Sequence, residues 1–128
     1  MKKLVEDWMT FADEDLSVAD VLSNHSMTNA MAFHCQQAIE KYLKAFLIEN
    51  DIPLQKIHDL NRLNETVKKV RDLGIDEDKL AEINEVYFDT RYPGEFGLTP
   101  NGMPTGEQIK GFIAFAKEVK TIISSAMT

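Results

Sequence analysis

The apolar residues of this chain recur at spacings of three and four, which is the period of one face of an α-helix. Five helices are predicted, over residues 3–24, from Thr28 to Asn50-Asp51, from Asp59 to Gly74, from Asp76 to Arg91, and from Thr105 to the C-terminus. Asp59 can cap the third, and Thr105 with Gln108 matches a capping box for the fifth. No segment alternates like a strand between hairpin turns. We therefore predict one all-α domain over residues 1–128, an up-and-down bundle of four main helices plus a fifth.

The segment 92–104 breaks this pattern, because it holds three of the four prolines in the chain. We predict that it is not helical. Connections of this length inside a small domain are uncommon and are often lids or binding loops. An irregular crossover between distant helix ends explains the segment equally well, so the sequence leaves both interpretations open.

The predicted helix from Thr28 has two different faces. One is apolar and predicts packing in the core, through Ala32, Cys35, Ile39, Tyr42, Leu43 and Phe46. The opposite face mixes polar groups with small side chains, in Ala30, His34, Gln37, Ala38, Lys41, Lys44, Ala45 and Ile48. Small residues allow a second helix, a dimer mate or a ligand to come close. Alternatively, Lys41 and Lys44 simply solvate an exposed face.

Three further polar residues lie at predicted helix ends. His58 and Asp59 precede the third helix, and Arg91 ends the fourth, one turn beyond Tyr87. Each has an ordinary structural role, since Asp59 can cap, Arg91 can satisfy terminal carbonyl groups and His58 can fill a turn. Their presence together keeps a binding role open.

Charge and composition narrow the classes of function. The 128 residues are 44% hydrophobic, enough for one core, and carry a formal net charge of −7, which disfavours general DNA or RNA binding. A local pocket for one nucleotide stays compatible with that charge. No apolar run approaches the roughly 20 residues that cross a bilayer, and no signal peptide is apparent, so a cytoplasmic protein is predicted.

Catalytic chemistry finds little support in the residue pattern. The single cysteine, Cys35, falls on the apolar face, where burial quenches a thiol. His34 and Cys35 are adjacent and so point about 100° apart on a helix, and no His-x-x-x-His pair exists. We therefore predict no metal and no cofactor.

Several segments together carry a family resemblance. They are His34-Cys35-Gln36-Gln37-Ala38-Ile39-Glu40-Lys41-Tyr42-Leu43-Lys44-Ala45, His58-Asp59-Leu60, and Tyr87 ahead of Arg91-Tyr92-Pro93. With the Asp15 and Ala19 region, they make nearly all of the chain resemble the HEPN family (higher eukaryote and prokaryote nucleotide-binding domain). The resemblance implies a bundle of four main helices with a fifth, usually as a homodimer.

Many members of that family look like metal-independent ribonucleases, with an arginine followed four to six residues later by a histidine. That motif is missing after Arg62, Arg71 and Arg91. The chain instead resembles the branch associated with minimal nucleotidyltransferases. This implies an accessory module that binds nucleotide or substrate and regulates or assists the partner enzyme, without catalysis of its own. A toxin-like ribonuclease and a purely structural dimeric interaction protein are the alternatives.

The resemblance also implies a set of ligand-binding candidates. These are Lys41, Lys44, His58, Asp59, Arg91 and Tyr92, with His34, Gln37, Glu40 and Tyr87 in support. The cations Lys41, Lys44 and Arg91 would contact phosphate oxygens. Tyr87 or Tyr92 would stack on a base.

The remaining candidates would shape the pocket. His58 and Asp59 would orient it. Glu40 would either pair with Lys44 one helical turn away or hold Arg91 in place.

Overall fold

The computed structural model describes residues 2–91 and 104–128, and for residues 89–91 only the course of the helix. The described residues form the helices α1 (Lys3–Leu22), α2 (Thr28–Glu49), α3 (Leu60–Val70), α4 (Glu77–Arg91) and α5 (Gly106–Ala126), and they contain no strand. The predicted all-α fold is confirmed. Segment 92–104, apart from the buried Pro104, lies outside the described residues.

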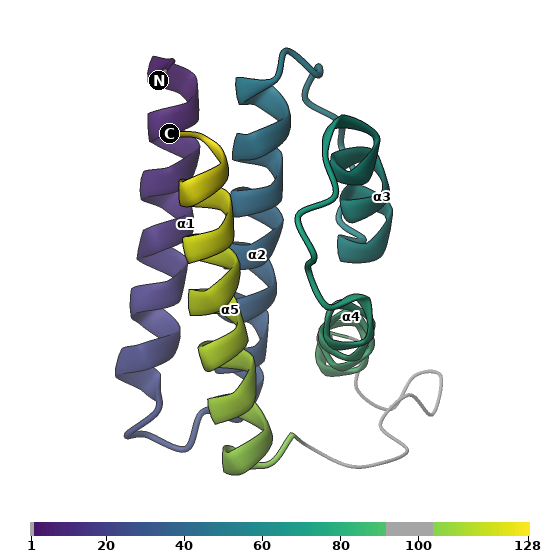
Figure 1. Cartoon of the computed structure of the whole chain (residues 1–128). Helices are drawn as coiled ribbons and strands as arrows, with labels where there is room; N and C mark the ends of the chain where they lie inside the picture. Colours follow the sequence, from purple (N-terminus) through teal and green to yellow (C-terminus); the bar gives the residue numbers. More distant parts are fainter. Residues whose placement is uncertain (1, 92–103) are drawn as a thin grey trace.

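Helix α2 is the centre of the fold and packs against each of the other four helices. Figure 1 shows α1, α2 and α5 side by side along their lengths, with α1 antiparallel to the other two. Helices α3 and α4 lie on the side of α2 away from α1, and α4 is viewed almost along its axis, so it crosses the long helices steeply. No described helix has an apolar stretch of the length a membrane span requires.

The predicted core face of α2 is confirmed, since Ala32, Cys35, Ile39, Tyr42, Leu43 and Phe46 are all buried. Burial continues around the helix to Ala38 and Ala45, which are fully buried as well. Small residues also lie on the buried side of α1, at Ala12 and Ala19. Small side chains allow two helix backbones to approach closely. Because this chain already covers Ala38 and Ala45, an Ala30-Ala38-Ala45 face cannot serve as a dimer surface.

The helix ends follow local side-chain chemistry. Asp59 caps α3 as predicted, accepting hydrogen bonds from the amides of Asn61 (2.9 Å) and Arg62 (3.1 Å). The predicted end of α3 at Gly74 is wrong, because α3 ends at Val70. Asp72 accepts a hydrogen bond from the Gly74 amide (3.0 Å), and this local turn replaces a further helical turn.

Helix α5 begins with half of the predicted capping box. The Thr105 hydroxyl accepts a hydrogen bond from the Gln108 amide (3.0 Å), as predicted. The Gln108 side chain does not reach back to Thr105; it donates instead to Glu82 of α4 (3.2 Å). Packing of α5 beside α4 therefore gives Gln108 a tertiary partner.

Candidate functional site

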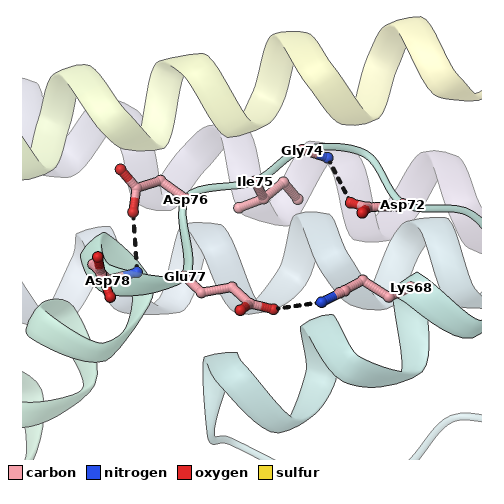
Figure 2. Close-up of a pocket in the computed structure, with 7 residues that line it drawn as sticks. All are labelled: Lys68, Asp72, Gly74, Ile75, Asp76, Glu77 and Asp78. Atoms are coloured by element: carbon pink, nitrogen blue, oxygen red, sulfur yellow. Dashed lines mark hydrogen bonds and ion pairs between the residues drawn. The ribbon is translucent and has the colours of Figure 1, made fainter.

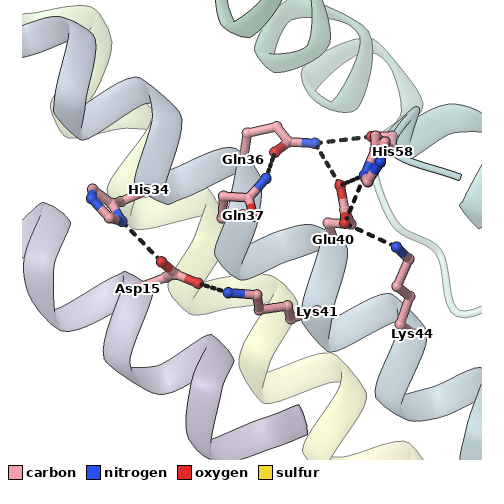
Figure 3. Close-up of polar contacts among 8 residues, drawn as sticks. All are labelled: Asp15, His34, Gln36, Gln37, Glu40, Lys41, Lys44 and His58. Atoms are coloured by element: carbon pink, nitrogen blue, oxygen red, sulfur yellow. Dashed lines mark hydrogen bonds and ion pairs between the residues drawn. The ribbon is translucent and has the colours of Figure 1, made fainter. Parts of the chain in front are cut away.

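The carboxylate of Glu40 on α2 is the centre of a polar cluster (Figure 3). It is buried and accepts hydrogen bonds from Gln36 Nε2 (3.1 Å) and Lys44 Nζ (2.9 Å). His58 Nδ1 lies 3.2 Å from both carboxylate oxygens. A buried charge needs such partners because it has lost its hydration. Of the two roles expected for Glu40, the pairing with Lys44 is present, and the contact with Arg91 falls on a side chain outside the described residues.

Lys44 is placed very differently from an exposed phosphate ligand. Only 5% of the residue is exposed, and its ammonium group is bound to Glu40 and lies 5.9 Å from the centre of the Trp8 ring. Such a cation is satisfied inside the protein by an ion pair and a cation–π contact. This burial speaks against the predicted contact between Lys44 and a phosphate.

A second polar cluster joins α2 to α1 around Asp15. The carboxylate accepts a hydrogen bond from Lys41 Nζ (2.5 Å), and His34 Nδ1 lies 2.9 Å from its other oxygen. Lys41 and His34 are half-buried, whereas Asp15 is almost fully buried. The two donors converge on one carboxylate and keep part of their surface in solvent.

Asp15 was not among the predicted site residues. The sequence signal was an acidic residue at a core-facing position of the first helix, between Ala12 and Ala19. Gln36 was missed too. It donates through Nε2 to the backbone carbonyl of His58 (2.9 Å), which holds the loop before α3 against α2.

The predicted residues that the structure brings together fall into two separate polar clusters (Figure 3). Gln37 donates to Gln36 Oε1 (2.8 Å) and so belongs to the Glu40 cluster, with Lys44 and His58. His34 and Lys41 belong to the Asp15 cluster.

The other predicted residues belong to neither cluster or lie outside the described residues. Asp59 is used by the α3 cap and by Asn84, whose Nδ2 donates to it at 3.1 Å. Arg91 is the last residue of α4, one turn beyond Tyr87, and its side chain is outside the described residues, as is all of Tyr92.

An aromatic contact adjoins the polar face. The rings of Phe33 on α2 and Tyr87 on α4 are stacked, with centroids 5.8 Å apart and planes at 29°. His34 meets Phe33 edge-on, with centroids 5.1 Å apart. Phe33 is 36% exposed and Tyr87 is half-buried. The end of α4 that carries Arg91 thus lies beside the first half of α2.

The face of α2 that carries the Glu40 and Asp15 clusters is less negative than the chain as a whole, so it suits a small anion better. At this face of α2, two lysines balance two carboxylates, in a chain of net charge −7. Among the described residues, no group of three histidine, cysteine or acidic side chains could hold a metal ion. The hydrogen-bond donors of the half-exposed part of this face are Lys41 and His34.

Cys35 is not available as a nucleophile. It is fully buried, and desolvation, with a smaller contribution from Asp20, raises the pKa of its thiol to about 12. The reactive thiolate is therefore almost absent near neutral pH.

A hollow of about 380 Å³ lies between the end of α3 and the start of α4 (Figure 2). It is lined by Lys68, Asp72, Gly74, Ile75, Asp76, Glu77 and Asp78. Lys68 pairs with Glu77 (3.1 Å), a hydrogen bond that raises the pKa of Lys68. Asp76 accepts hydrogen bonds from the first amides of α4. This hollow has four carboxylates and one lysine, so its charge repels phosphate. Two of the carboxylates, Asp72 and Asp76, already accept hydrogen bonds from nearby backbone amides.

Comparison with known proteins gives one family. A family model described as HEPN domain matches residues 5–126. Among solved structures, the crystal structure of an archaeal HEPN homologue is similar over 100% of both chains, with a TM-score of 0.72 and 21% sequence identity. That likeness concerns the fold. No curated protein matches the chain.

Proposed function

Because this chain belongs to the HEPN domain family, we propose that it is a nucleotide- or substrate-binding accessory module without catalysis of its own. It assists or regulates a partner minimal nucleotidyltransferase. The link to that partner rests on the sequence resemblance to the family branch. The discriminating observation is the neighbouring reading frame: a small nucleotidyltransferase encoded there would favour the pairing, whereas an isolated gene would leave the alternatives open.

One observation carries the binding proposal. Lys41 and His34 converge on Asp15 at a half-exposed position of α2. The carboxylate fixes the two donors in place, while their outer surfaces face solvent. An anion with several acceptor oxygens, such as a phosphate, can then bind without first ordering flexible side chains.

The order of residues argues against ribonuclease chemistry. All three histidines, at positions 25, 34 and 58, precede all three arginines, at positions 62, 71 and 91. An arginine followed by a histidine therefore cannot occur within these 128 residues. Without it, the chain has no counterpart of the family's general acid or base.

We would test binding by titrating ATP into isotopically labelled protein and following backbone amide shifts. We expect saturable shifts around His34, Gln37 and Lys41 that are lost in Lys41→Gln. The matched control is Lys117→Gln, which removes a lysine from an exposed ion pair with Asp20 on another face. An unchanged spectrum at several millimolar ATP would contradict the binding proposal, as would equal binding by both variants.

The ribonuclease alternative has its own test. We expect no cleavage of RNA in the absence of metal. Cleavage that disappears in Arg91→Ala would overturn the non-catalytic proposal, because contaminating nucleases do not respond to a substitution in this chain.

The structural alternative, a dimeric interaction protein, is favoured by a different observation. Leu4 and Phe11 on α1 are 53% and 57% exposed, and their separation of seven residues places them on one face of the helix. Exposed apolar groups in line are typical of a contact surface. A homodimer through this face is compatible with nucleotide binding. A purely structural role replaces the binding proposal only if ATP does not bind.

Light scattering coupled to size exclusion tests the dimer. If this face joins two copies, Phe11→Glu converts a dimer to a monomer, because it buries a charge opposite an apolar partner. Val21→Glu is the control, since Val21 is an exposed apolar residue on another face of the same helix. A monomeric parent protein would reject the dimer.

A further inference from the structure

We infer that the ligand of this site is a single nucleoside phosphate whose base lies against the Phe33–Tyr87 pair and whose phosphates contact Lys41 and His34. This inference rests on the proposed nucleotide binding. It adds a position for the base, with Phe33 as a stacking residue that the sequence did not indicate. We call Phe33, His34, Gln37 and Lys41 the α2 strip.

The α2 strip is continuous because its members follow the helical period. Phe33, Gln37 and Lys41 are spaced four apart, and each step of four turns only about 40° around the axis. His34 joins the two ends, since its ring contacts Phe33 and its Nδ1 lies 2.9 Å from Asp15. An aromatic end, an amide and a cationic end therefore lie in sequence along one helix.

The aromatic end has the chemistry of a stacking platform. Phe33 already stacks on Tyr87 from a second helix, which fixes the ring plane, and Phe33 stays 36% exposed. Aromatic rings fixed in this way bind the flat face of a base without strong preference for its identity. An aromatic pair that served only the core would have been buried more completely.

The opposite end suits phosphate and not a longer nucleic acid. Lys41 and His34 converge within hydrogen-bond distance of the same carboxylate, so the donors form one compact focus. The net charge of −7 repels an extended phosphate backbone. A ligand with one base and one phosphate group, or a short phosphate chain, fits this arrangement. Its base would lie on the Phe33–Tyr87 pair and its phosphates would contact Lys41 and His34.

Gln37 lies between the two ends. Its Nε2 donates to Gln36, which fixes the amide in the network of Glu40. Its carbonyl oxygen can accept a hydrogen bond from an amine or hydroxyl of the nucleotide. The middle of the α2 strip is thus polar, as a ribose or the edge of a base requires.

The experiment compares three probes, ATP, adenosine and inorganic tripolyphosphate, by amide-shift titration. ATP should bind more tightly than either fragment. Phe33→Leu should weaken the binding of ATP and of adenosine by roughly tenfold, the order expected for loss of one stacked base. The binding of tripolyphosphate should be unchanged. Lys41→Gln should weaken the binding of ATP and of tripolyphosphate and leave the binding of adenosine unchanged.

Phe11→Leu is the matched control, because it removes an exposed aromatic ring from α1 outside the stack. Amide spectra without ligand show whether each variant keeps its fold. If Phe33→Leu binds ATP as the parent does, or if ATP and tripolyphosphate bind equally, the base-stacking inference is overturned while phosphate binding stands. If no probe binds, the proposed function itself fails.

Discussion

At the scale of single residues, Glu40 shows how costly a buried charge is when it loses a partner. Its carboxylate is the acceptor for Gln36, Lys44 and His58. Glu40→Ala leaves the Lys44 ammonium buried without a counter-charge. We expect the free energy of unfolding to fall by about 3–5 kcal/mol, measured by urea denaturation.

Two comparisons separate burial from pairing. Replacing both charges, in the double variant Glu40→Leu with Lys44→Met, should recover much of the loss, because no unpaired charge stays inside. Asp7→Ala removes an exposed i,i+4 pair with Lys3 and should change stability far less. Equal effects of Glu40→Ala and Asp7→Ala would contradict the assigned role of Glu40.

Cys35 gives a second prediction at this scale. Burial raises the pKa of its thiol to about 12, so at pH 8 the thiolate is a very small fraction. We expect almost no reaction with a disulfide reagent in the folded protein and rapid, stoichiometric reaction in 6–8 M urea, a range of the order that unfolds small domains. Rapid reaction without denaturant would place the thiol at the surface.

At the scale of elements, Asn84 connects α4 to the start of α3. Its Nδ2 donates to Asp59 (3.1 Å) and Asn61 (2.9 Å), and its Oδ1 accepts from the Leu60 amide (3.0 Å). Asn84→Ala leaves that amide without its partner, which costs about 1–3 kcal/mol. We expect faster hydrogen exchange at residue 60 and a lower free energy of unfolding.

The control for Asn84 is Asn24→Ala, in the exposed turn after α1. It should leave both hydrogen exchange in α3 and stability nearly unchanged. Protection at residue 60 that survives in Asn84→Ala would mean that backbone packing alone holds α3 and α4 together.

At the scale of the whole molecule, alkaline pH should destabilise the protein through two buried acids, Tyr42 and Cys35. Tyr42 is fully buried and donates to Asp13 (2.5 Å), and burial first, then this hydrogen bond, raises the pKa of Tyr42. Burial raises the pKa of Cys35 as well. Both groups keep their protons in the folded state at a pH where the unfolded chain releases them.

The sign of the pH effect follows from this difference. Below pH 9, Tyr42 and Cys35 are protonated in both the folded and the unfolded state, so their contribution to the free energy of unfolding is fully present. This contribution is lost as pH rises. We expect the free energy of unfolding to fall above pH 9 through Cys35, and by roughly 1.4 kcal/mol more per pH unit above pH 10 through Tyr42. Urea titrations should show a shallower fall in Tyr42→Phe, and identical slopes would contradict the assignment.

The sequence alone determined the local structure of this protein. The period of apolar residues located all five helices, and Asp59 and Thr105 marked two helix starts, because helical period and capping depend on neighbours in the chain. It also placed His34, Gln37 and Lys41 on one face of α2, but it assigned the buried residues Ala38, Lys44 and Ala45 to the same face. The spacing of four residues offered the pairing of Glu40 with Lys44 as one of two alternatives, and the structure shows that pair.

Only the tertiary structure decided which polar side chains are buried and what they contact. Helical spacing places Lys44 beside Glu40, but packing against Trp8 of α1 decides that the pair is inside. Asp15 and Phe33 gained their partners from other helices, and no periodicity within one helix encodes such a contact. Burial depends on what other segments cover, and this is why the candidate site emerged only when the helices were assembled.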